Sequence, residues 1–290
     1  MTIRRTISLF IVSAILWAAP AFAQSPASER NAALRYWSAF SVMQDSAITA
    51  DQAAELNAVL AGRAEYDDSK FRQVVEKNRL ALEIMTRAAI LPECDWGLDY
   101  SLGSEEPVEY ARNALALGRL NVLHSLHLLN AGDKDAAVNA LAAGLHFSHD
   151  VANGGTLFAT LIAGQLISEH LRAATFAVRE SNLSAAQASA LQNAVARLGP
   201  EGLDWRSAID HEFQVTRTQF RADAQASAAL TRIDSACVKA LRDPSALPAV
   251  EDAIRAAPPA VAQLIPNPRR ILEAKQKLSA LLAQTRSPLQ

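Results

Sequence analysis

The sequence contains few of the residues that cross-link or interrupt a chain, with two cysteines, 11 glycines and 12 prolines among 290 residues. Long runs of β-branched residues, which favour strands, are absent. So are the glycine-rich phosphate loop, the dinucleotide-binding fingerprint and the G-x-S-x-G turn of serine hydrolases. These absences exclude the nucleotide and hydrolase sites that a short motif can encode. Any catalysis would have to come from residues scattered along the chain.

A large excess of charge of one sign is also lacking. The 28 Lys and Arg residues nearly balance the 30 Asp and Glu residues, for a formal net charge of -2. Because the two signs are evenly spread, we predict neither nucleic acid nor an anionic membrane as a partner. Hydrophobic residues make up 50% of the chain, which is enough for a core and argues against disorder.

The longest apolar run lies at the N-terminus. It covers residues 7–19, follows Arg4 and Arg5, and ends shortly before Ala21-Phe22-Ala23. This order is typical of a secretory signal peptide, and the run is shorter than the ~20 residues that a membrane span needs. We therefore predict a signal peptide over residues 1–23. The mature protein should be soluble, in the periplasm or secreted, with no membrane span after cleavage.

The remaining chain has a helical pattern throughout, because alanine and leucine dominate and Gly and Pro cluster between periodic segments. Capping boxes are expected at Thr49 with Gln52 and at Ser184 with Gln187. The sequence thus predicts an all-α fold. Helices are predicted over residues 30–45, 49–63, 67–91, 105–130, 133–152, 156–180, 184–198, 204–225, 228–242, 246–256 and 269–286.

Two segments are expected in the mature chain, a main helical domain over residues 24–199 and a distal helical segment over residues 200–290 packed on it. Gly199-Pro200 marks the division. Residues 132–145 resemble the second half of a tetratricopeptide repeat, but no further copy lies about 34 residues away. We therefore expect an irregular multi-helix domain of antiparallel hairpins and not a regular repeat array.

Two further motifs accompany this hairpin. Residues 31–37 read Asn-Ala-Ala-Leu-Arg-Tyr-Trp, and residues 94–97 read Cys-Asp-Trp-Gly. With the hairpin around Gly132, they resemble exported all-helical bacterial proteins that have no assigned activity. The resemblance implies an all-helical fold and supplies no chemistry, so no functional residue follows from it.

Histidines form the most suggestive pattern for a metal. His124 and His127 share one helix face, and so do His146 and His149 on the other arm of the hairpin. The two pairs are about 15 Å apart along a helix, too far for one tetrahedral site. We expect His124 and His127 to be hydrogen-bonded core residues and His146 to lie on a solvated polar stripe with Asp150. No metal or other cofactor is therefore expected, with a zinc site at His124 and His127 as the alternative.

The longest predicted loop, residues 92–107, is the candidate ligand site. Carboxylates beside aromatic rings can bind a cation or polar ligand, and loops often carry function. Two arginines on the following helix could bind a ligand carboxylate or the loop acids. The alternative is a loop held by its tryptophan, with surface salt bridges. The candidate residues are Asp95, Trp96, Asp99, Tyr100, Arg112 and Arg119.

Cys94 and Cys237 leave two interpretations open. In an oxidising compartment they could form a disulfide that ties the distal segment to the hairpin region. They could equally be two separately buried thiols, which behave as small apolar side chains.

Fold class and export favour a non-catalytic helical scaffold that binds a protein or peptide in a groove. The alternatives are a periplasmic protein that binds a small ligand or metal, and an enzyme of unrecognised type. An exposed apolar groove would favour the scaffold, whereas a deep, convergent polar pocket would favour the alternatives.

Overall fold

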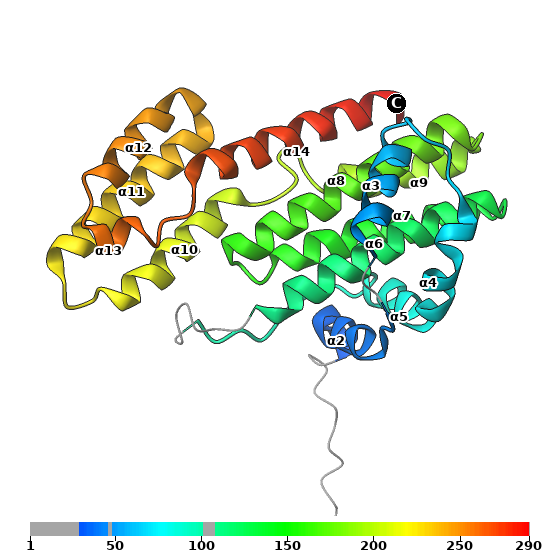
Figure 1. Cartoon of the computed structure of the whole chain (residues 1–290), viewed down its shortest axis with the longest axis horizontal. Helices are drawn as coiled ribbons and strands as arrows, with labels where there is room; N and C mark the ends of the chain where they lie inside the picture. The colour runs from blue at the N-terminus through cyan, green and yellow to red at the C-terminus, as the bar shows by residue number, and fades with distance from the viewer. Residues whose placement is uncertain (1–28, 46–47, 101–107, 290) are drawn as a thin grey trace, which may run out of the picture.

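The computed structural model describes residues 29–45, 48–100 and 108–289. Within these ranges all regular structure is helical, and the one β-type contact is an isolated bridge between Asn31 and Glu93. The predicted all-α fold is therefore confirmed (Figure 1). The predicted signal peptide, residues 1–23, lies outside the described residues.

The helices vary from one turn to more than six. They are α2 (Ala32–Val42), α3 (Ala50–Leu60), α4 (Arg72–Lys77), α5 (Arg79–Ala88), α6 (Glu109–Asn130), α7 (Lys134–Ala152), α8 (Leu157–Glu180), α9 (Ala185–Ala196), α10 (Trp205–Gln219), α11 (Ala224–Arg242), α12 (Leu247–Arg255), α13 (Pro259–Ala262) and α14 (Pro268–Leu289), with single 3-10 turns at Asp68–Lys70 and Pro244–Ala246.

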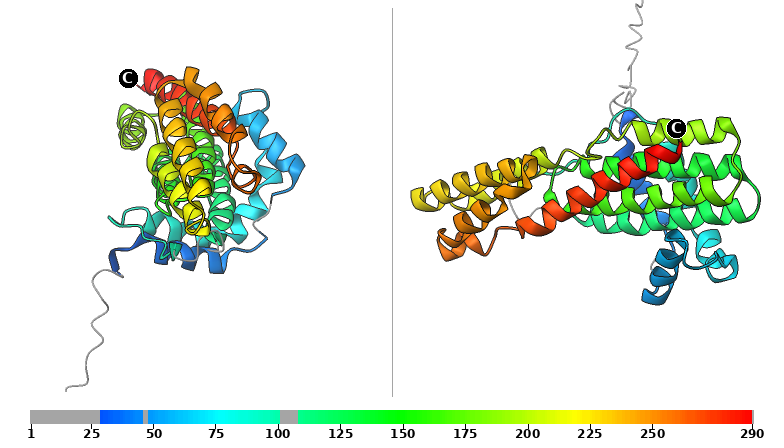
Figure 2. Two further views of the ribbon diagram at one scale, coloured as in Figure 1. Left: turned by 90° about the vertical axis from the view of Figure 1, so that its left-hand side faces the viewer. Right: turned by 90° about the horizontal axis from the view of Figure 1, so that it is seen from above.

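Helices α6, α7 and α8 form the centre of the molecule (Figure 2). The hydroxyl of Tyr110 donates to the Val151 carbonyl at 3.1 Å, and the Asn121 amide donates to the Ala140 carbonyl at 2.8 Å. Since the early residue of α6 pairs with the late residue of α7, these two helices run antiparallel. Gly132 turns the chain between them with φ of 84°, a conformation that glycine adopts without strain.

Helices α2 and α5 lie side by side against this centre (Figure 1). The single helix predicted over residues 67–91 is wrong in two respects: it starts with a 3-10 turn at Asp68–Lys70, and it is broken at Asn78 between α4 and α5. The Asn78 amide donates to the carbonyls of Val74 and Gln44, and its oxygen accepts from the Gln44 backbone N–H. These bonds fix the chain that leaves α2, and they compete with continuation of the helix.

Local capping signals mark several helix starts. Both predicted capping boxes, at Thr49 and Ser184, are present with reciprocal hydrogen bonds. One predicted boundary is wrong: α10 ends at Gln219, before the predicted break near residues 225–228. The Asp223 side chain accepts from two backbone N–H groups and begins α11. An aspartate at this position satisfies donors that the first turn leaves unpaired.

Helices α10 to α13 form one end of the elongated molecule, and α14 runs from that end back along α8 and α9 (Figures 1 and 2). Leu278 and Leu282 of α14 are almost completely buried, and both pack over Gly202. The last helix therefore joins the far end to the central helices. In the described ranges, no helix combines the length and apolar character that crossing a membrane requires.

Candidate functional site

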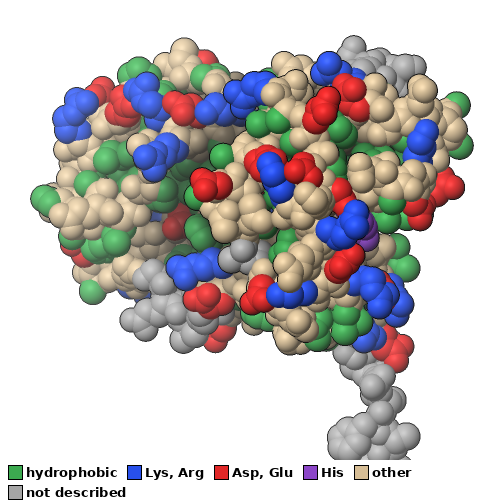
Figure 3. Space-filling view, turned by 45° about the vertical axis from the view of Figure 1, so that its right-hand side comes forward, with side chains coloured by type: hydrophobic (Ala, Val, Ile, Leu, Met, Phe, Trp, Pro, Cys, Tyr) green, Lys and Arg blue, Asp and Glu red, His purple; other side chains and the backbone are tan. Residues whose placement is uncertain are grey.

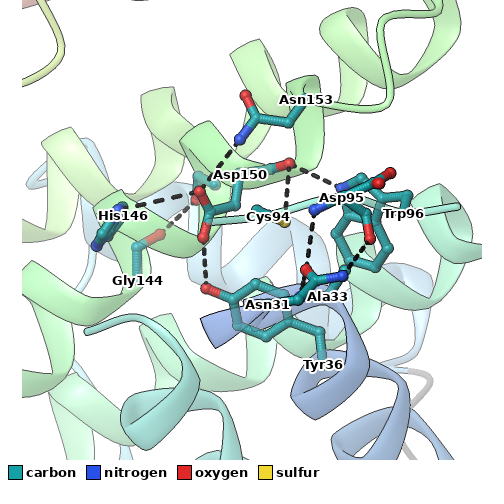
Figure 4. Close-up of polar contacts among 11 residues, drawn as sticks. Asn31, Ala33, Tyr36, Cys94, Asp95, Trp96, Gly144, His146, Asp150 and Asn153 are labelled. Atoms are coloured by element: carbon teal, nitrogen blue, oxygen red, sulfur yellow. Dashed lines mark hydrogen bonds and ion pairs between the residues drawn. The ribbon is translucent and has the colours of Figure 1, made fainter. Parts of the chain in front are cut away.

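The loop that the sequence offered as a ligand site is anchored by its tryptophan. Trp96 is only 5% exposed, and its indole N–H donates to the Asp150 carbonyl at 2.8 Å. Its ring stacks on that of Tyr110, with 4.2 Å between ring centroids. Asp95 exchanges two backbone hydrogen bonds with the Asn31 side chain (Figure 4). These contacts fit the alternative interpretation of a loop held in place by Trp96.

The other candidate residues do not converge on this loop. Arg119 forms a bidentate pair with the buried Glu169 of α8. Arg112 is exposed and lies 3.9 Å from Glu109 on its own helix. The Tyr100 ring meets the His211 ring edge-on at a centroid distance of 3.9 Å. Asp99 is exposed. The loop acids Glu105 and Glu106 lie outside the described residues.

The paired histidines of α6 have separate environments. His127 Nδ1 lies 2.6 Å from the Asp68 carboxylate, which also pairs with Arg72. His124 lines a different cleft, and its buried Nδ1 has no partner among the described residues. Burial, and to a lesser degree His127, lowers the pKa of His124. No group of three or more His, Cys, Asp or Glu side chains suited to a metal occurs in the described ranges.

The two cysteines are separate free thiols, so the disulfide interpretation does not fit this structure. Cys94 lies 3.8 Å from the Asp150 carbonyl oxygen. Cys237 is buried among α10, α11 and α14 side chains, including Ile209 and Leu272. Burial raises the pKa of both thiols, in the case of Cys237 to about 12. Each therefore packs as a small apolar residue.

Asp150 connects the N-terminal region to the central helices. Its carboxylate accepts a 2.7 Å hydrogen bond from the Tyr36 hydroxyl and lies 3.9 Å from His146 Nε2 (Figure 4). The sequence placed Asp150 on a solvated stripe, but it is 5% exposed because α2 covers that face. Burial raises the pKa of Asp150, opposed by the Tyr36 hydrogen bond and by His146 and His149.

A groove opens on the other side of His146, between α5, α7 and α9. It has a volume of about 520 Å³. Five of its 13 lining residues are alanine, and Ile90 is 82% exposed. The described residues that line it are Thr86, Ala89, Ile90, Asn139, Ala142, Ala143, His146, His149, Ala190, Asn193, Ala194, Arg197 and Leu198.

The groove continues along α5 towards α6. A second cleft of about 320 Å³ shares Thr86 and Asn139 with the first. It is lined further by Leu82, Glu83, Arg87, His124, Leu128, Ala136 and Ala140. Because Thr86 and Asn139 line both clefts, the two are adjacent, and together we call them the α5–α7–α9 groove. Its small side chains leave room for an occupant on an apolar surface.

The charged and titratable groups of this groove are unevenly placed. Among the described residues that line the α9 part there are Arg197, His146 and His149, but no acid. Burial lowers the pKa of His149, opposed by the nearby Asp150 carboxylate. The α6 part holds Glu83 and Arg87, 3.9 Å apart. Figure 3 shows acidic and basic side chains interspersed over the exposed face that it displays, with a histidine at the surface beside Lys or Arg side chains.

A buried hydrogen-bond network supports α7 beneath the groove. His170 of α8 is fully buried; its Nδ1 lies 2.8 Å from the Leu166 carbonyl, and its Nε2 lies 3.2 Å from the Asn121 amide. Nδ1 therefore carries the proton and Nε2 accepts. A Cβ at Gly144 would lie 2.2 Å from His170 Nε2, so only glycine allows this approach of α7 to α8. Burial lowers the pKa of His170 to about 4.

Comparison with protein-family models, curated proteins and solved structures gave no match to this chain. The resemblance to exported helical proteins therefore stays a prediction. The groove itself was missed by the sequence analysis, although one signal was present. Ala190, Asn193, Ala194 and Arg197 recur at helical spacing and form one small, partly apolar face of α9.

Proposed function

We propose that this protein is an exported, non-catalytic scaffold that binds a peptide or protein segment in the α5–α7–α9 groove. The proposal includes removal of residues 1–23 and action in the periplasm or outside the cell. The supporting observation is an open groove of two adjacent clefts, in which alanine is the most frequent lining residue. Helical or extended peptides bind in grooves between helices through regularly spaced side chains.

The shape of the site favours an extended partner over a compact one. Polar groups lie at its edges: Asn193 and Arg197 are exposed, and Asn139 stands where the clefts join. A catalytic centre needs convergent groups with hydrogen-bonded geometry, and the described lining around His146 and His149 contains neither Ser nor Cys. Apolar contacts would therefore supply most of the binding free energy in the groove.

A small ligand is the second candidate. The larger cleft, at about 520 Å³, falls within the roughly 300–1,000 Å³ range of small-molecule sites. The two kinds of ligand would contact different parts of the groove, because a compact ligand would occupy only the α9 part. A segment of a protein would contact both parts.

Selection of binders from a random peptide library, followed by fluorescence anisotropy, tests the proposal. Ala143→Trp on α7 and Ala194→Trp on α9 fill the groove from opposite walls and should weaken peptide binding by about tenfold or more. Ala196→Trp adds the same side chain at an exposed position of α9 outside the groove and should leave binding unchanged. Thermal melting confirms that each variant is folded.

Two results would overturn this function. One is a selection that yields no binding peptide. The other is peptide binding that tolerates both groove-filling substitutions. Hydrogen exchange adds a map of the contact: bound peptide should protect α5, α7 and α9, and protection confined to α10–α13 would place the interaction elsewhere.

A further inference from the structure

We infer that the α9 end of the groove selects a carboxylate, so that the bound segment presents an Asp or Glu side chain beside its apolar residues. This inference rests on the proposed function and specifies the chemistry of its partner. It starts from Arg197, which lines the groove and forms neither an ion pair nor a side-chain hydrogen bond with any residue that the structure describes.

The guanidinium group of Arg197 is paired with no carboxylate of a described residue that would compete with a ligand. No acid contributes to the described lining of this part of the groove. Arg119 is held by Glu169, and Arg217 by Asp234. Exposed arginines such as Arg232 also form no ion pair with any described residue, but Arg197 differs from them in lining the groove. An arginine presents several N–H donors in a planar arrangement that matches a carboxylate. Arg197 is therefore available to an anionic group from outside.

Neighbouring polar groups can complete the recognition. Asn193 precedes Arg197 by one helical turn, so both side chains lie on the groove face of α9. His149 faces them from α7 across the groove. Asp150 lies behind His146 and His149, and its carboxylate is already bonded to the Tyr36 hydroxyl. The acidic group nearest to the histidines is thus turned into the protein interior, towards α2.

The opposite end of the groove has a different charge pattern. Glu83 pairs there with Arg79 at 2.7 Å and lies 3.9 Å from Arg87, so a carboxylate already lines that end. An acidic side chain gains most at Arg197, because the Asp150 carboxylate, 3.9 Å from His146 Nε2, is 5% exposed and already bonded to the Tyr36 hydroxyl. A bound segment should therefore have one preferred orientation, with its apolar side chains along the alanine residues of the groove and its acidic side chain at Arg197.

A carboxylate from a protein fits this arrangement better than a free organic acid. Beyond Thr86 and Asn139 the groove extends into a second cleft, which a short acid held at Arg197 would not reach. A segment of chain places side chains in both clefts and its acidic residue at one end. The charge complementarity thus points to an acidic, apolar peptide segment.

The test uses the tightest peptide from the library selection, with both ends blocked, and a second version in which Asp and Glu are replaced by Asn and Gln. The amide version should bind about fivefold more weakly, near the upper range for an exposed ion pair. Arg197→Gln should weaken the acidic peptide similarly and abolish the difference between the two versions. Arg197→Lys should restore part of it. Arg232→Gln, at an exposed position of α11, is the matched control.

The outcomes separate this inference from the proposed function. One result would overturn the carboxylate assignment alone. In it, Ala143→Trp weakens peptide binding, but neither Arg197→Gln nor replacement of the peptide's acids by amides changes the affinity. Absence of any peptide binding would overturn both. Octanoate serves as the free-acid probe: if it binds through Arg197 more tightly than every selected peptide, the protein source of the carboxylate is wrong. Raising the salt concentration should weaken the acidic peptide more than its amide version.

Discussion

The three central helices and the α10–α13 end are held together in different ways. The centre buries polar groups that bond across helices: Asn121, Ser148 and His170 are fully buried and join α6, α7 and α8. The α10–α13 end packs mainly through apolar side chains such as Ile233 and Phe213. Directional bonds specify which residues must face each other, whereas apolar contacts depend mainly on shape. The groove is built on the more closely specified of the two regions.

The two regions also differ in how much surface they bury. Helices α12 and α13 each bury one side chain, Val250 and Val261. The α10–α13 end is joined to the central helices by α10, which packs on α8, and by α14, which carries Leu278 and Leu282 back to them. A region with few buried contacts opens at lower cost than a central one. The comparison thus predicts that the far end is the first part to lose its structure.

Removing part of the α14 contact should have the largest effect. Leu282→Ala deletes a fully buried side chain and should lower the free energy of unfolding by about 2–5 kcal/mol. Leu264→Ala, at a side chain that is 43% exposed, should change it by less than about 0.5 kcal/mol. Chemical denaturation measures both variants. In hydrogen exchange, Leu282→Ala should reduce the protection of backbone amides more in α10–α13 than in α6–α8. An equal loss of protection in both regions would contradict the comparison.

Acidification should test the polar centre. Burial lowers the pKa of His170 from 6.5 to about 4, so its contribution is fully present above pH 6.5. As the pH falls below that value, the unfolded chain binds a proton that the folded protein excludes, and stability is lost progressively down to about pH 4. The loss should total about 3 kcal/mol.

The measurement is the pH dependence of unfolding in the wild type and in His170→Gln, whose difference isolates this residue. His211→Gln is the matched variant in the far end. Burial lowers the pKa of His211 too, but that side chain is less buried than His170, and it should contribute a smaller pH dependence. An equal or larger contribution from His211 would remove the distinction between the two regions.

The smallest expected effect concerns the cysteines: Cys94 lies against the central helices at Asp150, and Cys237 lies in the α10–α13 end. Because Cys94 and Cys237 are separate thiols, a reducing agent should leave the melting temperature unchanged to within about 1 °C. Both should titrate in denaturant, giving two free thiols per chain. In the folded protein they should react slowly with alkylating reagents, since a raised pKa leaves little thiolate. Fewer than two thiols, or a melting temperature that falls on reduction, would show a covalent link between the regions.

The sequence by itself determined the helical class and many local boundaries. Thr49 and Ser184 begin helices because each cap is completed within four residues, by Gln52 and Gln187. Local information failed where a distant partner intervened, as at Asn78. There, hydrogen bonds to Gln44, far away in the sequence, end a helix that periodicity alone would continue.

The groove was decided by tertiary structure. Asp150 and His146 lie one turn apart on α7, and periodicity places both on one polar stripe. In the folded protein α2 covers Asp150 and supplies the Tyr36 hydroxyl, whereas α5 and α9 leave His146 at the edge of an open groove. Spacing along a helix determines which residues share a face. Which helix covers that face, and where it ends, depends on packing between segments far apart in the chain.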